Sequence, residues 1–284
     1  MSTMEISRDM LRGLRDYEAA GERVAQVIGE AARDRKMLVR FLARFASWNG
    51  LFGSGVALLA SEIGRSQQLF REEGFPAPLA DRSVLVASYF FDAARDEFDD
   101  RDTPHRDTHR CLAQAFLAGL IEVSKDRYPE LGDARQLETF LAHPLWLDAL
   151  RHRVAYGYGA GNADDHAGIF RAMGYHLGSE LLADQEFTRI DATLRATDAS
   201  LVETLRSTTI AIAGQPHNSY QWIAIHSGAG GAAEADHFAW AVRGVNLAFQ
   251  YVPTSLHDEL RHQVAEGYLA FARDHDEFFS RSLR

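Results

Sequence analysis

A single stripe of apolar residues, running from about residue 163 to 195, most strongly constrains the fold of this chain. An α-helix turns by about 100° per residue, so positions three or four apart share a face. That face carries mostly apolar side chains, together with two histidines and a glutamate: His166, Ile169, Met173, His176, Leu177, Glu180, Ala183, Phe187 and Leu194. A long helix with one apolar face needs other helices to cover it. The stripe therefore predicts a helical bundle.

Helical periodicity recurs along most of the chain. Further helical segments are predicted at about 5–33, 35–65, 83–100, 104–125, 135–142, 145–156, 198–213, 226–248 and from Pro253 onward, some of them short. No strand pair, internal repeat or low-complexity linker is predicted. We therefore expect one all-α domain over residues 1–284, built from about eight or nine helices, with its core bundle over about 35–280.

Composition excludes several classes of protein. The formal net charge of −10 argues against nucleic acid or an anionic membrane as the main partner. Cys111 is the only cysteine, so no intrachain disulfide is possible. The longest nearly uninterrupted apolar run, 84–91, is too short to span a bilayer, and the charged first ten residues do not form a signal peptide. We expect a cytoplasmic protein with a small-molecule substrate, and a homodimer remains open.

Glu180 is the first functional candidate because of its neighbours on the helix. By helical phase it lies among Met173, Leu177 and Phe187, one turn after His176. A carboxylate in such a stripe costs free energy to bury unless it is paired, protonated or bound to a metal. A structural ion pair with an arginine is the alternative explanation.

A second carboxylate, Glu97, has apolar neighbours by phase in the predicted helix over 83–100. Asp100 lies at the margin of the same face. Asp92, Asp96 and Asp99 share a different face, opposite the apolar one, and are predicted to be solvated. Glu97 is therefore the ligand candidate of this helix, and a plain buried or rim carboxylate is the alternative.

Histidines on two other segments extend the candidate set. His105 and His109, one turn apart, open the apolar face of the helix that follows Pro104. His226 and His237 share a face if one helix, continuous or locally distorted, crosses the glycine-rich sequence SGAGGAA between them. The alternatives are partly exposed histidines in a first helical turn and, for the second pair, a loop between two helices. By contrast, the pattern Glu259-x-x-His262 points away from the apolar face of its helix and is rejected as a metal motif.

Carboxylates and imidazoles carried by facing helices suit a mononuclear or dinuclear iron or manganese site. Zinc hydrolysis needs fewer ligands. The candidate metal ligands are two acidic residues and several histidines on the inward faces, together with one first-turn glutamate: Glu97, His105, His176, Glu180, His226, Glu234 and His237. Asp100 and His109 remain open as further ligands. The aromatic and sulfur side chains of Phe90, Phe116, Met173 and Trp240 are expected to wall a substrate pocket.

In order and helix phase, three groups of residues resemble the ligands of the heme-oxygenase-like diiron oxidases. They are Glu97 with His105, then the sequence GYHLGSE that ends at Glu180, then His226 with Glu234 and His237. This superfamily is related in fold to thiaminase II and the pyrroloquinoline quinone synthase. The resemblance implies Fe(II), two ions per chain, with O₂ as co-substrate and an external electron donor possible. It also implies oxidation of a small amino-acid-like or fatty-acid-like substrate in bacterial secondary metabolism.

The chain departs from the family pattern at two places. Glu97-x-x-Asp100 stands where the family often has Glu-x-x-His, and the histidine His105 lies beyond a proline. The spacing His226-x₇-Glu234-x₂-His237 is longer than the family's His-x₃-Asp-x₂-His. The ligand role of Glu234 and the number of metal ions are therefore open.

Three other functions remain possible from the sequence. A metal-free enzyme of the thiaminase II type would use a buried carboxylate as base, with a raised pKa at Glu97 or Glu180. A magnesium-dependent prenyl or terpene enzyme is suggested by the acidic run over 96–102. A helical heme- or ligand-binding protein is suggested by Gly228, Gly230 and Gly231, which would let a macrocycle approach a helix.

Overall fold

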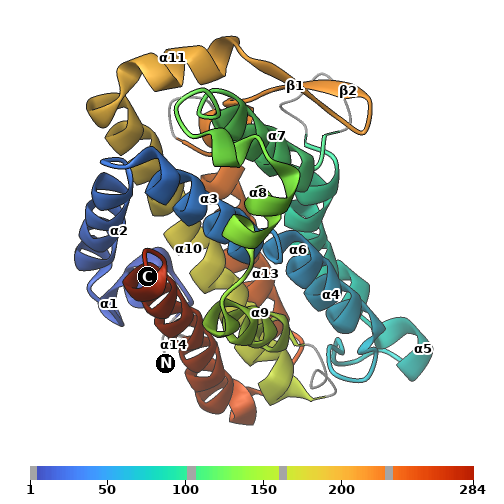
Figure 1. The fold of residues 1–284 in the computed structure, drawn as a ribbon. Coiled ribbons are helices and arrows are strands. Elements are labelled where there is room, and N and C mark those ends of the chain that lie inside the picture. Colours follow the sequence, from blue (N-terminus) through green and yellow to red (C-terminus); the bar gives the residue numbers. More distant parts are fainter. Residues whose placement is uncertain (1–4, 101–106, 160–164, 228–232) are drawn as a thin grey trace.

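Figure 1 shows the computed structural model, which describes residues 5–100, 107–159, 165–227 and 233–284. These residues form fourteen α-helices, two short 3₁₀ helices and one hairpin of two strands. In chain order the elements are α1 (Arg8–Gly13), α2 (Tyr17–Ala31), α3 (Arg35–Asn49), α4 (Phe52–Arg65), α5 (Ala77–Ala80), α6 (Ser83–Phe98), α7 (His109–Glu122), η1 (Pro129–Leu131), α8 (Ala134–Leu141), α9 (Leu145–Gly157), α10 (His166–Thr197), α11 (Ala199–Ser207), β1 (Thr209–Ile212), β2 (Gln215–Asn218), α12 (Gln221–His226), α13 (Ala233–Phe249), η2 (Thr254–Leu256) and α14 (His257–Arg281).

The long helix predicted from the apolar stripe is α10. It begins after Asp165, whose side chain accepts a hydrogen bond from the backbone N–H of Gly168 (2.6 Å) and so caps the first turn. α10 packs most extensively against α14, and also against α13, α2 and α4 (Figure 1). The all-α architecture predicted from helical periodicity is therefore confirmed, with α10 in contact with much of the bundle.

The bundle is divided into more helices than the eight or nine predicted. The expected helix over 5–33 is split into α1 and α2, because the Asp16 side chain accepts from the backbone N–H of Ala19 and starts a new helix. The expected helix over 35–65 ends at Asn49, and α4 starts at Phe52. Local caps and breaks, rather than loss of the helical period, account for these divisions.

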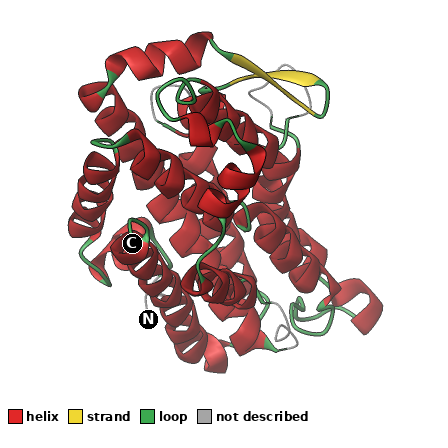
Figure 2. Cartoon of the chain, viewed as in Figure 1, coloured by secondary structure: helices red, strands yellow, loops and turns green. Residues whose placement is uncertain are grey.

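Residues 209–218 form a β-hairpin, so the prediction of no strand pair is wrong (Figure 2). Its two-residue turn consists of Ala213 (φ 51°) and Gly214 (φ 81°). Two consecutive positive φ angles match the right-handed twist of a hairpin. The β-branched Thr209, Ile210 and Ile212 favour an extended backbone in β1. The helix predicted over 198–213 accordingly ends at Ser207.

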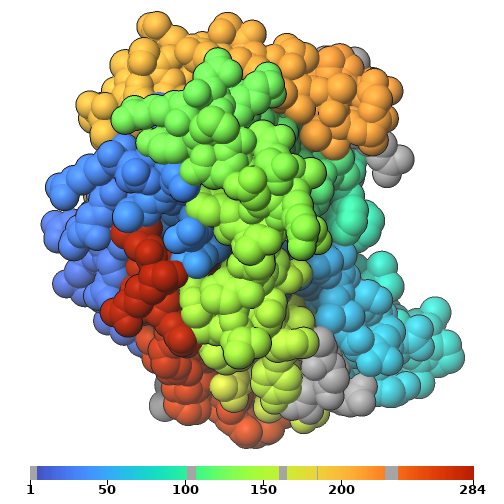
Figure 3. Space-filling model, in the orientation of Figure 1, coloured from blue at the N-terminus to red at the C-terminus, as the bar shows by residue number. Residues whose placement is uncertain are grey.

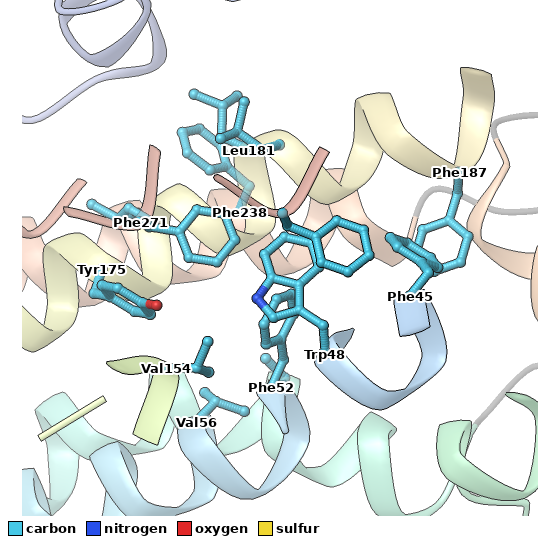
Figure 4. Packing of buried hydrophobic residues seen from close by; sticks show 14 of the residues in the cluster. Phe45, Trp48, Phe52, Val56, Val154, Tyr175, Leu181, Phe187, Phe238 and Phe271 are labelled. Carbon is cyan, nitrogen blue, oxygen red and sulfur yellow. The ribbon is translucent and has the colours of Figure 1, made fainter. Parts of the chain in front are cut away.

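One cluster of buried hydrophobic side chains connects helices from both ends of the chain. Its centre is aromatic: Trp48 of α3 stacks on Phe278 of α14 (4.6 Å between ring centroids), and Phe45 packs edge-on against Phe187 of α10 (Figure 4). Leu11 and Ile28 are fully buried in the same cluster. Helices α1 and α2 therefore contribute to the core, although the core bundle was predicted to begin near residue 35.

The outer surface shows how the remaining helices are arranged around this core. In Figure 3 the segment containing α7, α8 and α9 runs down the front face, between the α2–α3 region and the α4–α6 region. Within the described ranges, no helix is both long and apolar enough to cross a membrane.

Candidate functional site

Five helices bring eight titratable side chains together inside the bundle, and we call this set the His/carboxylate cluster. Its members come from α6 and the residues just after it, and from α7, α10, α12 and α13: Asp96, Glu97, Asp100, His109, His176, Glu180, His226 and His237. Seven of the eight residues are no more than 9% exposed. The side chain of Glu97 is 25% exposed, so it is the member of the cluster nearest to solvent.

His109 lies between two carboxylates of the cluster. Its Nε2 donates to Asp100 Oδ2 (2.8 Å), and its Nδ1 lies 3.1 Å from Glu97 Oε1. Thr108 caps α7 by accepting from the backbone N–H of Cys111, which places His109 at the first helical position. The backbone N–H of Asp100 also donates to the carbonyl of Asp107, which closes the connection from α6 to α7.

Burial and the neighbouring charges have opposite effects on the pKa values of His109 and Glu97. Burial lowers the pKa of His109, but the Glu97 charge and the hydrogen bonds to both carboxylates raise it to about 10. Burial likewise raises the pKa of Glu97, yet His109, His226 and His237 more than offset this, and the pKa lies below its usual value. His109 is therefore protonated and Glu97 ionised at neutral pH.

His226 ends α12 and turns one ring nitrogen toward His109. Its Nδ1 donates to the carbonyl of Trp222 (2.7 Å), which leaves Nε2 as the acceptor nitrogen, 3.3 Å from His109 Nδ1. The ring stacks on Phe187 of α10, with centroids 4.4 Å apart. The imidazole is thus fixed in both tautomer and orientation.

His237 of α13 is held in the same way by Asp96. Its Nε2 donates to Asp96 Oδ2 (2.9 Å), and its Nδ1 lies 3.6 Å from Glu180 Oε2. Asp96 is 3% exposed, so the prediction that it is solvated is wrong. The face of α6 opposite its apolar stripe is not free, because α6 packs against α4 and also against α13.

His176 and Glu180 complete the cluster from α10. His176 Nδ1 lies 3.4 Å from Glu180 Oε1. The hydroxyl group of Ser179 lies between His176 and Tyr158, with its Oγ 2.7 Å from the Tyr158 hydroxyl oxygen. Burial, together with the charge on His237, lowers the pKa of His176 to about 3. In the described part of the chain, His176 Nε2 and Glu180 Oε2 have no hydrogen-bond partner although both are buried.

The cluster contains five of the seven side chains predicted as metal ligands: Glu97, His176, Glu180, His226 and His237. His105 lies outside the described residues. His109, one turn later on the same predicted seam, is the histidine that reaches Glu97. Glu234 lies in the first turn of α13, but the position of its side chain is outside what the structure describes.

The continuous helix predicted across 226–248 is interrupted. α12 ends at His226, where Ser227 adopts an extended backbone (ψ 129°), and α13 begins at Ala233. The segment 228–232 lies outside the described residues. His226 and His237 nevertheless both reach the cluster, each from its own helix.

A cavity of about 240 Å³ adjoins the exposed edge of the cluster. Glu97 and His109 lie on its inner wall, and the remaining lining comes from α3, α4, α6 and α7: Asn49, Gly50, Gly53, Ser54, Phe98, Thr108, Arg110 and Ala113. The predicted pocket wall of Phe90, Phe116, Met173 and Trp240 is not found there. The first three are fully buried in the core, and Trp240 packs on Tyr89.

Across the described residues, no three or more His, Cys, Asp or Glu side chains are arranged so that they could hold a metal ion as they stand. The donor atoms of the cluster contact one another at 2.8–3.6 Å instead of surrounding a common point. A metal would therefore require some of these side chains to turn.

The arrangement of helices defines a heme-oxygenase-like fold. The chain is similar in structure to a TenA homologue from Pseudomonas syringae pv. tomato, with a TM-score of 0.50 and 13% sequence identity, over 96% of this chain and 92% of that one. No protein-family model matches the sequence, and no curated protein is significantly similar to it. At 13% identity the likeness establishes the fold alone.

Proposed function

We propose that the chain is a non-heme iron oxidase or oxygenase, with the His/carboxylate cluster as its metal centre and O₂ as co-substrate. The observation that carries this proposal is the orientation of three histidines. His109, His226 and His237 each have one ring nitrogen fixed by an acceptor, and each turns the other nitrogen toward Glu97 or Glu180, or toward another histidine of the set. Metal-ligating histidines are held in this way by carboxylates and carbonyls.

The donor set has the chemistry that iron requires. Carboxylate oxygens from Glu97 and Glu180 and imidazole nitrogens from His109, His226 and His237 are the ligand types used by non-heme iron and dinuclear carboxylate sites. These five side chains, which come from five helices, suffice for two ions that share carboxylates, and we therefore propose two Fe(II) per chain. Bound iron would supply the electrons that reduce O₂, and an external electron donor remains part of the proposal.

The charge balance of the metal-free cluster supports the same proposal. Four carboxylates of the cluster are buried or nearly so, and a buried carboxylate is unfavourable without a compensating cation. The protonated His109 now supplies that charge at Glu97 and Asp100. Metal binding requires neutral imidazole, so a metal would displace this proton and take over its role.

Each remaining residue of the cluster has a role that follows from its contacts. Asp96 and Asp100 hold His237 and His109 in one tautomer. The Trp222 carbonyl does the same for His226. His176, which is neutral and lies beside Glu180, positions that carboxylate.

A metal-free enzyme of the thiaminase II type is the second candidate, because a TenA homologue shares the fold. That function would call for a cluster carboxylate with a raised pKa. The pKa of Glu97 is lowered instead, owing to the three neighbouring histidines. The magnesium-dependent alternative is less favoured because Asp96 and Asp100 are bonded to histidines. The glycines that suggested a heme contact lie outside the described residues.

Anaerobic loading with Fe(II), followed by removal of free metal and elemental analysis, tests the proposal. We expect about two iron ions per chain and a change in the visible spectrum on adding O₂. His237→Ala is expected to lose at least half of the bound iron, because it removes a donor that contacts Glu180. His262→Ala, at an exposed position on α14, is the matched control. Iron retention by the His237 variant equal to that of the control would contradict the assignment.

Asp96 provides a separate test through its hold on His237. Asp96→Ala is expected to lower the affinity for Fe(II) by about 10–100-fold, because the imidazole loses the partner that fixes its tautomer. Asp92→Ala, on an exposed part of the same helix, should leave the affinity unchanged. Equal affinities in a competition assay with a chromogenic chelator would show that Asp96 has no part in orienting a ligand.

A further inference from the structure

A second cavity, of about 440 Å³, lies between α9, α10 and α14, which contact one another in the bundle (Figure 1). The residues that line it are separate from the His/carboxylate cluster and from the cavity beside Glu97. Its volume falls within the range of about 300–1,000 Å³ that small-molecule sites usually have. The cavity is therefore large enough for a ligand of its own, and the charges on its wall indicate the chemistry of that ligand.

Two carboxylates on the wall of this cavity are paired with arginines. Asp274 accepts from Arg153 Nε (2.8 Å) and from the hydroxyl of Tyr175 (2.8 Å). Glu277 accepts from Arg153 Nη2 (2.5 Å) and from Arg281 Nη1 (2.8 Å). These bonds hold the Arg153 guanidinium in one orientation, and they balance the negative charge of each carboxylate.

Two further arginines lie on the same wall, and their charge is not balanced in this way. Arg171 of α10 and Arg273 of α14 are exposed, and neither makes a hydrogen bond or ion pair with any residue that the structure describes. Around the cavity, four arginines (these two, Arg153 and Arg281) therefore stand against two carboxylates, which leaves two positive charges. In a chain with a net charge of −10, such a local excess of positive charge favours an external dianion.

The backbone beneath both arginines is held by the packing of α10 on α14. A Cβ atom on Gly267 would lie 1.9 Å from the carbonyl oxygen of Arg171, so the two helices are in direct contact at this point. Gly267, Ala270 and Arg273 follow one another at intervals of three residues and all line the cavity, so they share one face of α14. Only the side chains of the two arginines need to be ordered when a ligand binds, which keeps the entropic cost of binding low.

A phosphate monoester suits this wall better than a carboxylate does. It carries a charge of about −1.5 to −2 at pH 7 and has three acceptor oxygens, so it can bind guanidinium groups from two helices at once. The ring of Tyr156, on α9, is 60% exposed on the same cavity and offers a face on which a planar group can stack. A ligand that uses both features has a phosphate and a planar ring.

We propose that this cavity binds a phosphate monoester that carries a planar ring, of the chemical class of a nucleoside monophosphate. Arg171 and Arg273 bind the phosphate oxygens, and the ring of the ligand lies against Tyr156. Arg153, held by its two carboxylates, adds a fixed positive charge beside the phosphate. This inference does not depend on the proposed function, because no residue of the His/carboxylate cluster takes part in it.

Calorimetric titration of the full-length chain tests the inference, with adenosine monophosphate (AMP) as probe and with adenosine and inorganic phosphate for comparison. We expect AMP to bind about tenfold more tightly than adenosine, because only AMP makes charge-assisted hydrogen bonds to the arginines. We expect AMP to bind about threefold more tightly than inorganic phosphate, because only AMP has a ring that stacks on Tyr156.

Substitutions on the wall test each contact separately. Arg171→Gln and Arg273→Gln are each expected to weaken AMP binding about tenfold. Arg135→Gln, at an exposed position on α8 that does not line the cavity, is the matched control and should bind AMP as the unchanged protein does. Because all three side chains are exposed, the variants are expected to fold, and thermal unfolding establishes that they do.

Tyr156→Ala is expected to lower the affinity for AMP to that for inorganic phosphate and to leave the binding of inorganic phosphate unchanged. Leu145→Ala, at a position on the same helix that is 88% exposed, is the control and should bind both probes as the unchanged protein does.

The outcomes are distinct from those of the iron experiments. Equal binding of AMP and adenosine, no binding of AMP, or AMP binding by the Arg171 and Arg273 variants equal to that of the Arg135 control would overturn the anion site. AMP binding no tighter than that of inorganic phosphate, or a Tyr156 variant that binds AMP like the Leu145 control, would overturn the contact with the ring. Iron uptake is measured separately, so the failure of either inference leaves the other in place.

Discussion

Gly267→Ala is expected to destabilise the protein by about 3 kcal/mol or more, or to prevent folding, because it forces α10 and α14 apart. A Cβ atom at this position would lie 1.9 Å from the carbonyl oxygen of Arg171 and 2.8 Å from the backbone nitrogen of Tyr175. Both neighbours are backbone atoms of α10, so no side chain can turn away to make room. α10 and α14 form the most extensive helix contact of the bundle, and the strain cannot be relieved locally.

Urea denaturation of the variant measures this cost, with Gly64→Ala as the matched control. The control also replaces a helical glycine by alanine, but its new methyl group has ordinary contact with Ala87 at 3.5 Å. Alanine is favoured over glycine inside a helix by about 0.5–1 kcal/mol, so the control is expected to be neutral or slightly stabilised. If both variants unfolded at the same urea concentration, the close approach of α10 and α14 would be disproved.

Local periodicity was enough to predict the elements whose faces are simply apolar or polar. The stripe around Glu180 identifies α10, and the outward phase of His262 agrees with its exposed position. Helical period is a property of a short window of sequence, which explains why these predictions needed no knowledge of the neighbouring helices.

Features that depend on neighbours could not be predicted in this way. Asp96 is buried because α13 covers a face of α6 that the periodicity of α6 alone marks as polar. His275 lies by helical phase at the margin of the apolar face of α14, yet it is only 1% exposed because it packs beside Trp48 and Phe279. The burial of a marginal residue is decided by what packs against it, and a single helix carries no information about that.

The hairpin over 209–218 was missed for a different reason. Its strands are four residues long and follow a helix directly, so the alternation of apolar and polar residues is too short to distinguish from helical spacing. A signal was nevertheless present. The β-branched residues before Ala213-Gly214, and the glycine at a position that needs positive φ, favour a two-residue turn.

The candidate site shows the same division. Glu97, Glu180, His226 and His237 were identified because each lies on a face with apolar neighbours. The choice of His105 over His109 rested on a helix start at Pro104, whereas α7 begins at His109. The contacts of Asp96 and Asp100 with histidines join residues far apart in sequence or in separate elements, so no spacing pattern encodes them.

A second buried acid–histidine pair lies away from the His/carboxylate cluster. Glu186 of α10 and His275 of α14 are both at most 1% exposed, with His275 Nε2 3.1 Å from Glu186 Oε1, though without hydrogen-bond geometry. Burial raises the pKa of Glu186 from 4.5 to about 8 and lowers the pKa of His275 from 6.5 to about 3. Both groups are therefore uncharged at neutral pH, as their aromatic surroundings require.

These shifts give the free energy of unfolding a defined pH profile. The stability that Glu186 contributes is lost as the pH rises from 4.5 to 8, since the native state keeps a proton that the unfolded state releases. The contribution of His275 is lost as the pH falls from 6.5 to 3, since the unfolded state gains a proton that the native state excludes. Between pH 4.5 and 6.5 the two effects cancel, because each state binds one proton.

Above pH 6.5 only the glutamate effect remains, so the pair is expected to cost the protein about 2 kcal/mol of stability between pH 6.5 and 8. Glu186→Gln keeps the size and shape of the side chain but cannot ionise. The difference in unfolding free energy between the variant and the unchanged protein should therefore shift in favour of the variant by about that amount between pH 6 and pH 8.

Urea denaturation at both pH values measures this difference. Glu259→Gln, at an exposed site on α14, is the control and should follow the unchanged protein. If the Glu186→Gln profile ran parallel to that of the control, Glu186 would be ionised at pH 6 in the folded chain as it is in the unfolded chain. Its pKa would then not be raised by burial.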